Sequence, residues 1–314
     1  IINGEPNSIF SEILLKSLKI LKIKRTIILI SSLKILQLQM RKLKYKKNIK
    51  IIDPEKLKNY RLNNKSINLI DVNFSQNRPF NKISSKSNNF LKKSFHTAFR
   101  LVKNQKIKKI INGPISKKHF LGKKYLGITE YISNHFSIKN NCMLIFNKKL
   151  SVATVTTHLP LKLVPKNINK KIIQNKIKLI QEFYKKKLNI NPRIGVLGLN
   201  PHCESILKYN EDERVIRPIV NKMKKKGYNV SGPYPADTIF LKNNRKRFDV
   251  ILGMYHDQVL GPIKTLYEYD AINITLGLPF IRISPDHGPN EKMQGKNLSN
   301  PLSLIRAINF LDKN

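Results

Sequence analysis

The chain has 314 residues, 40% of them hydrophobic, which fits one large domain or two medium ones. No apolar run approaches the roughly 18 residues that span a bilayer, and two cysteines, Cys142 and Cys203, are too few for a disulfide scaffold, so we expect no membrane partner and a reducing cytoplasm. The net charge of +41 would attract polyanions non-specifically, but the lysines are scattered among abundant Asn and Ile, which indicates A/T-rich coding drift rather than a specific nucleic-acid site.

Short apolar runs alternate along the chain with longer, Lys-rich amphipathic segments. Residues 75–89 are the clearest predicted loop. Helices are predicted at 169–188 and 211–227, and the second has acidic residues in its first turn and Gly227 at its end, as a helix should. Strands are predicted at residues 26–32, 109–114, 151–157, 193–199, 249–255 and 272–277. This alternation predicts an α/β fold with mainly parallel sheets.

Three of the predicted strands are followed within three residues by a histidine. The strand ends TTHLPL, GLNPH and MYHDQ carry His158, His202 and His256. In open parallel sheets, ligands bind outside the carboxyl ends of the strands. Three imidazoles with one open position form a catalytic divalent-metal arrangement. A single histidine after a strand is more often a hydrogen-bonded loop residue, but three of the seven histidines in equivalent positions favour a metal site.

Several common catalytic motifs are missing from the sequence. No GxGxxG follows a strand, and no GxxxxGK[ST] or GxSxG occurs. Cys203 stands beside His202 but lacks a CxxC partner, so we interpret it as a small core or wall residue rather than a reactive thiolate.

The motifs INGPISK, GITEY, TTHLPL, GLNPH, GPYPADTIF, MYHDQ, NITLGLPFIR and DHG occur in this order between about Gly113 and Gly288. Together they resemble the 4-hydroxythreonine-4-phosphate dehydrogenase family of vitamin B6 biosynthesis. The resemblance implies an isocitrate/isopropylmalate dehydrogenase-like fold of two α/β domains, with the active site in the interdomain cleft. The expected boundaries are 1–125 plus 280–314 for the first, discontinuous domain and 126–279 for the second, which carries the metal histidines.

The resemblance also implies the activity. The enzyme would oxidise 4-phosphooxy-L-threonine with NAD or NADP to 2-amino-3-oxo-4-phosphooxybutanoate, which decarboxylates to 3-amino-2-oxopropyl phosphate on the way to pyridoxal phosphate. One divalent metal per site, zinc, cobalt or magnesium, would act as a Lewis acid. The family is a homodimer in which partner residues complete the active site.

The resemblance assigns roles to individual residues of this chain. The metal ligands would be His158, His202 and His256. The substrate contacts would be Thr129, Lys264, Asn273 and Arg282, of which the two cations suit a phosphate or carboxylate. Asp237, Asp257 and Lys117 are candidates for orienting a ligand or moving a proton, although either aspartate could equally be a turn cap. The loop DHGPNEKMQGKNLSNP would hold the adenosine part of the cofactor through His287, Gly288 and Gly295.

The chain departs from the family pattern at several of these motifs. The family has GHTE where this chain has GITE, so Ile128 replaces a substrate-binding imidazole. Cys203-Glu204-Ser205-Ile206 replaces a glycine-rich segment, and Pro289-Asn290 stands where small residues are usual. Two alternatives therefore stay open: a related metal- and NAD-dependent dehydrogenase acting on another hydroxy acid, or an inactive basic relic that binds polyanions.

Overall fold

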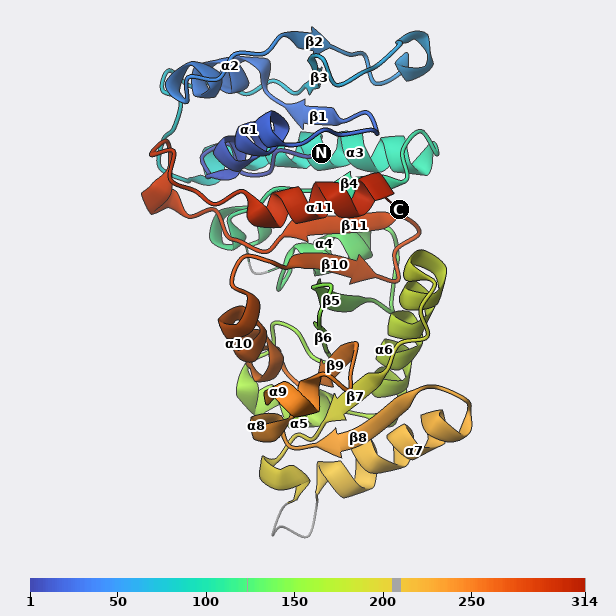
Figure 1. The fold of residues 1–314 in the computed structure, drawn as a ribbon. Helices are drawn as coiled ribbons and strands as arrows, with labels where there is room; N and C mark the ends of the chain where they lie inside the picture. The colour runs from blue at the N-terminus through green and yellow to red at the C-terminus, as the bar shows by residue number, and fades with distance from the viewer. Residues whose placement is uncertain (123, 205–209, 314) are drawn as a thin grey trace. The chain divides into compact units, whose positions relative to one another are not determined.

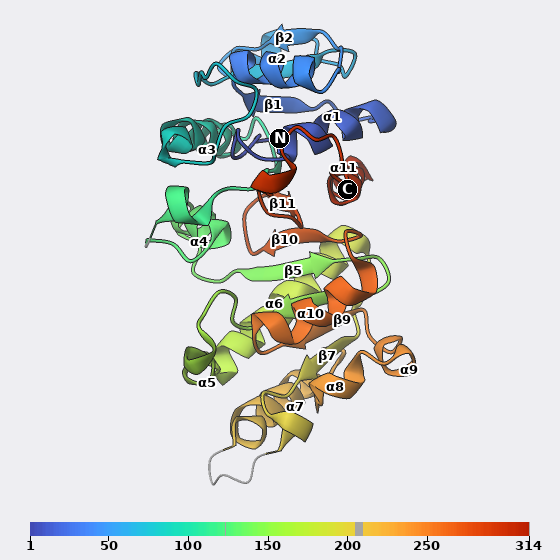
Figure 2. The ribbon, with the colours of Figure 1, turned by 90° about the vertical axis from the view of Figure 1, so that its left-hand side faces the viewer.

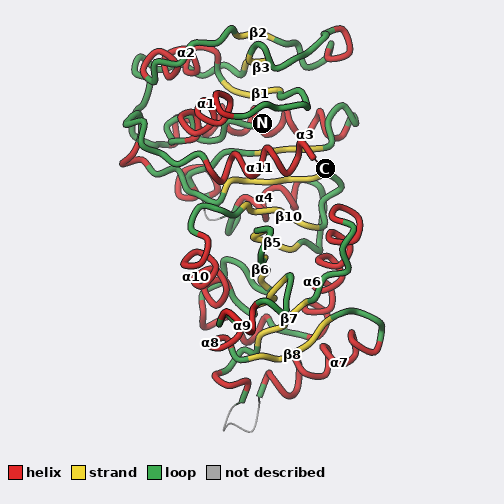
Figure 3. Tube along the Cα trace, viewed as in Figure 1, coloured by secondary structure: helices red, strands yellow, loops and turns green. Residues whose placement is uncertain are grey.

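The computed structural model describes residues 1–122, 124–204 and 210–313 (Figure 1). The chain divides into two compact units, Ile1–Ile128 with Phe280–Asn314, and Thr129–Pro279. Helices alternate with strands in both units, which confirms the predicted α/β class (Figure 3). None of the described helices is long and apolar enough to cross a membrane.

The first unit contains two groups of parallel strands. β3 lies between β1 and β2, and β4 pairs with β11. Residue Ile2 forms parallel bridges to Ile30 of β1 and to Asn112 just after β4, so the first residues of the chain connect the two groups. The strands are β1 (Ile28–Ser31), β2 (Ile49–Ile51), β3 (Ile67–Asp71), β4 (Lys109–Ile111) and β11 (Ile281–Pro285).

The longer helices of the first unit pack through buried apolar side chains. The sequence of α3 shows the pattern: Leu91, Phe95 and Phe99 recur at a spacing of four residues, so they lie on one side of the helix, and all three are buried. The helices are α1 (Phe10–Ile20), α2 (Leu33–Lys42), α3 (Asn88–Lys103) and α11 (Leu302–Lys313).

The second unit is built around strands in the order β10-β5-β6-β9-β7-β8. β6, β9, β7 and β8 run parallel to one another, whereas β5 is antiparallel to both β10 and β6. All four residues of β9 are buried, as expected for a central parallel strand covered on both faces. The strands are β5 (Cys142–Phe146), β6 (Ser151–Thr154), β7 (Ile194–Leu197), β8 (Val230–Tyr234), β9 (Val250–Gly253) and β10 (Ile272–Leu276).

Helices cover both faces of this sheet. α10 packs on β6 and β9, and α6 packs on β5 and β10 from the other side (Figures 1 and 2). α6 begins where the Asn169 side chain accepts a hydrogen bond from the Ile172 N–H, and its buried Ile173, Ile177 and Ile180 form one apolar face. The helices are α4 (Ile128–His135), α5 (Val164–Asn167), α6 (Lys170–Phe183), α7 (Arg217–Lys225), α8 (Ala236–Ile239), α9 (Lys242–Arg245) and α10 (His256–Tyr267).

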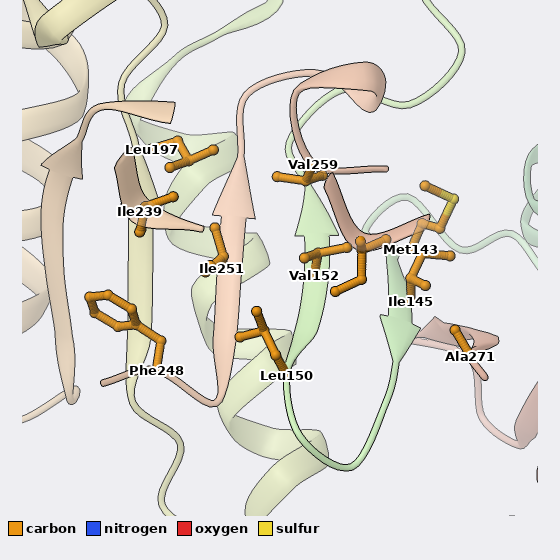
Figure 4. Close-up of a cluster of buried hydrophobic side chains, with 11 residues drawn as sticks. Met143, Ile145, Leu150, Val152, Leu197, Ile239, Phe248, Ile251, Val259 and Ala271 are labelled. Carbon is orange, nitrogen blue, oxygen red and sulfur yellow. The ribbon is translucent and has the colours of Figure 1, made fainter. Parts of the chain in front are cut away.

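The core beneath α10 holds the strand ends in place. Val152 of β6, Ile251 of β9 and Leu197 of β7 pack with Val259 of α10 in one buried cluster (Figure 4). Because the cluster spans three neighbouring strands, it fixes their register at the edge where the histidines follow.

The six predicted strands and both predicted helices are present, although most are shorter than predicted. One local prediction was wrong. The loop predicted at 75–89 ends early, because α3 already begins at Asn88. The acidic residues predicted for the first turn of the helix at 211–227 do lie there, in a π-helical turn (Asp212–Ile216) that continues directly into α7. Gly227 does end the helical segment, with φ +81°.

Candidate functional site

The three predicted metal histidines follow three adjacent parallel strands. β9 lies between β6 and β7, so the carboxyl ends of all three strands lie at one edge of the sheet. His158 follows β6, His202 follows β7, and His256 is the first residue of α10 after β9.

The structure brings two of these imidazoles together. The ring centroids of His158 and His256 are 5.8 Å apart. Two imidazoles on one tetrahedral metal, with metal–nitrogen bonds of about 2.1 Å, would have centroids about 5.3 Å apart, so this pair fits a shared ion. His202 is exposed, in a short turn with φ +55°. Within residues 1–122, 124–204 and 210–313 no group of three or more His, Cys, Asp or Glu side chains is close enough to hold a metal.

Each of the paired histidines has a carboxylate beside its Nδ1 atom. His256 Nδ1 lies 2.6 Å from Asp257 Oδ1, and His158 Nδ1 lies 3.6 Å from Glu130 Oε1. A carboxylate at Nδ1 favours the tautomer that leaves Nε2 unprotonated for a metal. Burial would raise the pKa of Glu130, but interactions with His158 and a hydrogen bond from Thr157 outweigh it, and the pKa of this carboxyl is lowered.

A hydrogen-bond network connects the three strand ends. Gln258 accepts a bond from the Met254 N–H and donates one to the Gly198 carbonyl, both 2.7 Å long. Thr156 Oγ1 donates to the Met254 carbonyl at 2.7 Å. Met254 and Gly198 follow β9 and β7, so these bonds join the segments that lead to the histidines.

A buried carboxylate holds the segment before His202. Asp212 is fully buried and accepts hydrogen bonds from the Leu199 and Asn200 backbone N–H groups at 2.7 and 3.1 Å. Burial raises the pKa of the neighbouring Cys203 thiol to about 11, with further contributions from the Asp212 and Asp237 charges. Cys203 is therefore protonated near neutral pH, in agreement with its interpretation as a wall residue. Ser205 and Ile206 of the segment that departs from the family pattern lie outside the described residues.

The other candidates in the second unit have different degrees of exposure. Thr129 is buried in the first turn of α4, which begins at Ile128. Lys264 is half-buried on α10, and Asp237 is exposed on α8. Asn273 of β10 has a buried Oδ1 atom with no hydrogen-bond partner among the described residues.

The remaining candidates belong to the first unit. Arg282 of β11 is completely buried, and its Nε donates to Asn112 Oδ1 at 2.7 Å. Lys117 is exposed. His287 is half-buried, its Nδ1 lies 2.9 Å from the Gly288 carbonyl, and its ring stacks on Phe10.

The predicted cofactor loop is anchored to α1. Glu12 is buried and accepts hydrogen bonds from the Asn297 and Ser299 N–H groups at 3.2 and 2.6 Å. Gly288 has open space beside its Cα, whereas Gly295 has φ +66° and packs near Phe80. The loop is thus held near its C-terminal end, and there is open space beside Gly288.

Sequence reasoning gave no role to four of these residues: Glu12, Glu130, Asp212 and Gln258. Glu130 and Gln258 stand inside the motifs GITEY and MYHDQ. Their positions beside the candidate site residues Thr129 and His256 were the signal that could have identified them. Glu12 acts on a loop distant from it in sequence, and nothing in the local pattern around Glu12 or Asp212 reveals the backbone groups that they bind.

The fold is of the isocitrate dehydrogenase-like type. The isocitrate dehydrogenase from Methylococcus capsulatus shares this fold, with a TM-score of 0.50 and 11% identity over 98% of this chain and 82% of that one. The family profile "Pyridoxal phosphate biosynthetic protein PdxA" matches residues 22–311, and the chain belongs to this family. It is an oxidoreductase.

Individual relatives carry the names of two phosphate-ester dehydrogenases. The 4-hydroxythreonine-4-phosphate dehydrogenase of Sulfurihydrogenibium sp. (strain YO3AOP1) is 38% identical, over 97% of this chain and 94% of that protein. The D-threonate 4-phosphate dehydrogenase of Cupriavidus necator is 34% identical, over 77% and 74%. The crystal structure of the Klebsiella pneumoniae 4-hydroxythreonine-4-phosphate dehydrogenase has a TM-score of 0.82 and 29% identity, over 98% and 96%.

Proposed function

We propose that the chain oxidises 4-phosphooxy-L-threonine at its secondary alcohol, using NAD or NADP and a divalent metal. The product, 2-amino-3-oxo-4-phosphooxybutanoate, would lose CO2 to give 3-amino-2-oxopropyl phosphate for pyridoxal phosphate synthesis. The observation that carries the proposal is the pair His158 and His256, 5.8 Å apart at the carboxyl edge of adjacent parallel strands.

His158, His202 and His256 would hold the metal. Bound metal supplies a Lewis acid, zinc, cobalt or magnesium, and bound NAD or NADP supplies the hydride acceptor. Asp257 would accept from His256 Nδ1 and so leave Nε2 available to bind. Ligation by His202 requires its exposed turn to approach the other two rings, and the MYHDQ and GLNPH segments are already joined through Gln258.

Two cations and two polar groups would bind the substrate. Lys264 and Arg282 suit its phosphate and carboxylate. Thr129 and Asn273 would supply hydrogen bonds, and the buried Asn273 Oδ1 is an acceptor without a donor among the described residues. The candidates for removing the hydroxyl proton are Lys117, Asp237 and Asp257, and those for contacting the cofactor are His287, Gly288 and Gly295.

D-Threonate 4-phosphate is the second candidate substrate. A relative that is 34% identical carries that name, and Ile128 cannot donate the hydrogen bond that a histidine could offer here. The two substrates differ at C2, where one has an amine and the other a hydroxyl group. Ile128→His, with Ile128→Leu as its matched control, tests whether this position affects the choice.

The direct test is NADH or NADPH formation from each substrate, before and after metal removal with a chelator. We expect turnover with 4-phosphooxy-L-threonine that is lost with chelator, restored by zinc, cobalt or magnesium, and absent in His256→Ala. Turnover of D-threonate 4-phosphate alone would support the second candidate. No turnover of either by metal-loaded protein, together with salt-sensitive binding of polyanions, would support the inactive relic.

We further propose a homodimer in the cytoplasm. Leu161, which follows His158 in the TTHLPL motif, is 67% exposed, and this suits a surface covered by a second copy. Cys142 and Cys203 are free and buried, as a reducing compartment permits. Sedimentation of the purified protein tests the dimer, and a monomer that retains full activity would refute a shared active site.

A further inference from the structure

Glu130 places a carboxylate next to the candidate ligand His158. The residue lies in the first turn of α4, and its Oε1 atom is 3.6 Å from His158 Nδ1. The Thr157 hydroxyl donates to the same oxygen at 3.0 Å. The residue next to His158 in the chain therefore holds the carboxylate in place.

Two polar atoms of this pair are buried and have no hydrogen-bond partner among the described residues. They are Glu130 Oε2 and His158 Nδ1. A buried donor or acceptor without a partner costs about 1–3 kcal/mol. A shift of under about 1 Å would turn the 3.6 Å contact into a charge-assisted hydrogen bond.

The environment of Glu130 differs from that of the carboxylate beside the other ring. The Asp257 side chain is 89% exposed, whereas that of Glu130 is 28% exposed. Water competes strongly for an exposed carboxylate and weakly for a sheltered one. A hydrogen bond from His158 to Glu130 would thus be weakened less by water than the bond between His256 and Asp257.

We propose that Glu130 is a positioning residue: it accepts the Nδ1–H of His158 and thereby directs the Nε2 lone pair to the metal. The inference rests on the proposed metal site, and it makes Glu130 a partner of a ligand rather than a ligand. A purely structural alternative exists, because an acidic residue in a first helical turn also stabilises the helix.

The first test measures zinc binding to the full chain by competition with a chromophoric chelator. We expect Glu130→Gln to weaken zinc binding about 10–100-fold and Glu130→Asp to recover part of it. Glu213→Gln is the matched control, since Glu213 is also in the second unit but pairs with Arg217 on the surface. The purely structural alternative predicts instead a lower melting temperature of the metal-free Glu130→Gln protein with zinc affinity unchanged.

The second test needs no metal. Nitrogen-15 NMR of the metal-free protein, with the signal assigned through His158→Ala, reports which ring nitrogen is protonated. We expect Nδ1–H in the wild type and a mixture of tautomers in Glu130→Gln. Unchanged zinc affinity and an unchanged tautomer in Glu130→Gln would overturn the proposal. Unchanged zinc affinity in both His158→Ala and His256→Ala would instead overturn the metal site itself.

Discussion

Gln258→Leu removes the side chain that joins the segments after β9 and β7. Gln258 is 9% exposed, and both of its hydrogen bonds are 2.7 Å long. Leucine has a similar size but leaves the Met254 N–H and the Gly198 carbonyl without this partner. Each buried group without a partner costs about 1–3 kcal/mol, and apolar burial of leucine offsets part of the sum, so we expect a loss of about 2–4 kcal/mol.

Amide hydrogen exchange reports this loss locally. Peptides that contain Met254 and Gly198 should exchange faster in Gln258→Leu, and zinc affinity should fall about tenfold because the histidine-bearing segments are less well ordered. Gln181→Leu is the matched control. Gln181 is also buried but donates a longer bond of 3.2 Å, to the exposed Asn191, so its replacement should cost less than about 1 kcal/mol. Equal exchange and equal zinc affinity in the two variants would refute the reasoning.

Three further predictions concern the first unit. Glu12→Gln turns one carboxylate oxygen into an amide nitrogen that cannot accept a hydrogen bond. The cofactor loop near Ser299 should therefore lose about 1–3 kcal/mol of stability, and its amide hydrogens should exchange faster. Unchanged amide exchange would contradict this prediction. Burial raises the pKa of Glu5, so the wild type loses stability as the pH rises from the ordinary pKa through the raised one. Glu5→Gln should therefore gain stability relative to wild type as the pH rises from about 4 towards neutrality. A difference in urea midpoints that does not change with pH would argue against this. Arg282→Lys removes the planar Nε donor to Asn112 and should lower the free energy of unfolding by about 1–3 kcal/mol. An unchanged melting temperature would show that this hydrogen bond does not stabilise the fold.

Much of the fold could be read from the sequence because its signals are local. The buried runs around Val250 and Ile194 are short, apolar and followed by polar residues, which identifies parallel strands and their carboxyl ends. Other strands escaped prediction. β2 has mostly exposed residues, and β8 contains Pro233 and Gly232, so neither shows a clear strand pattern.

The sequence by itself determined the α/β class, the three strand ends that carry histidine, and the family. Only the tertiary structure decided that β6, β9 and β7 are neighbours, that His158 lies beside His256 and that Glu130 faces His158. The physical reason is the distance along the chain over which each signal acts. Strand and helix signals arise from neighbours along the chain, whereas strand order and side-chain pairing depend on how distant segments pack, and no single stretch of sequence contains that information.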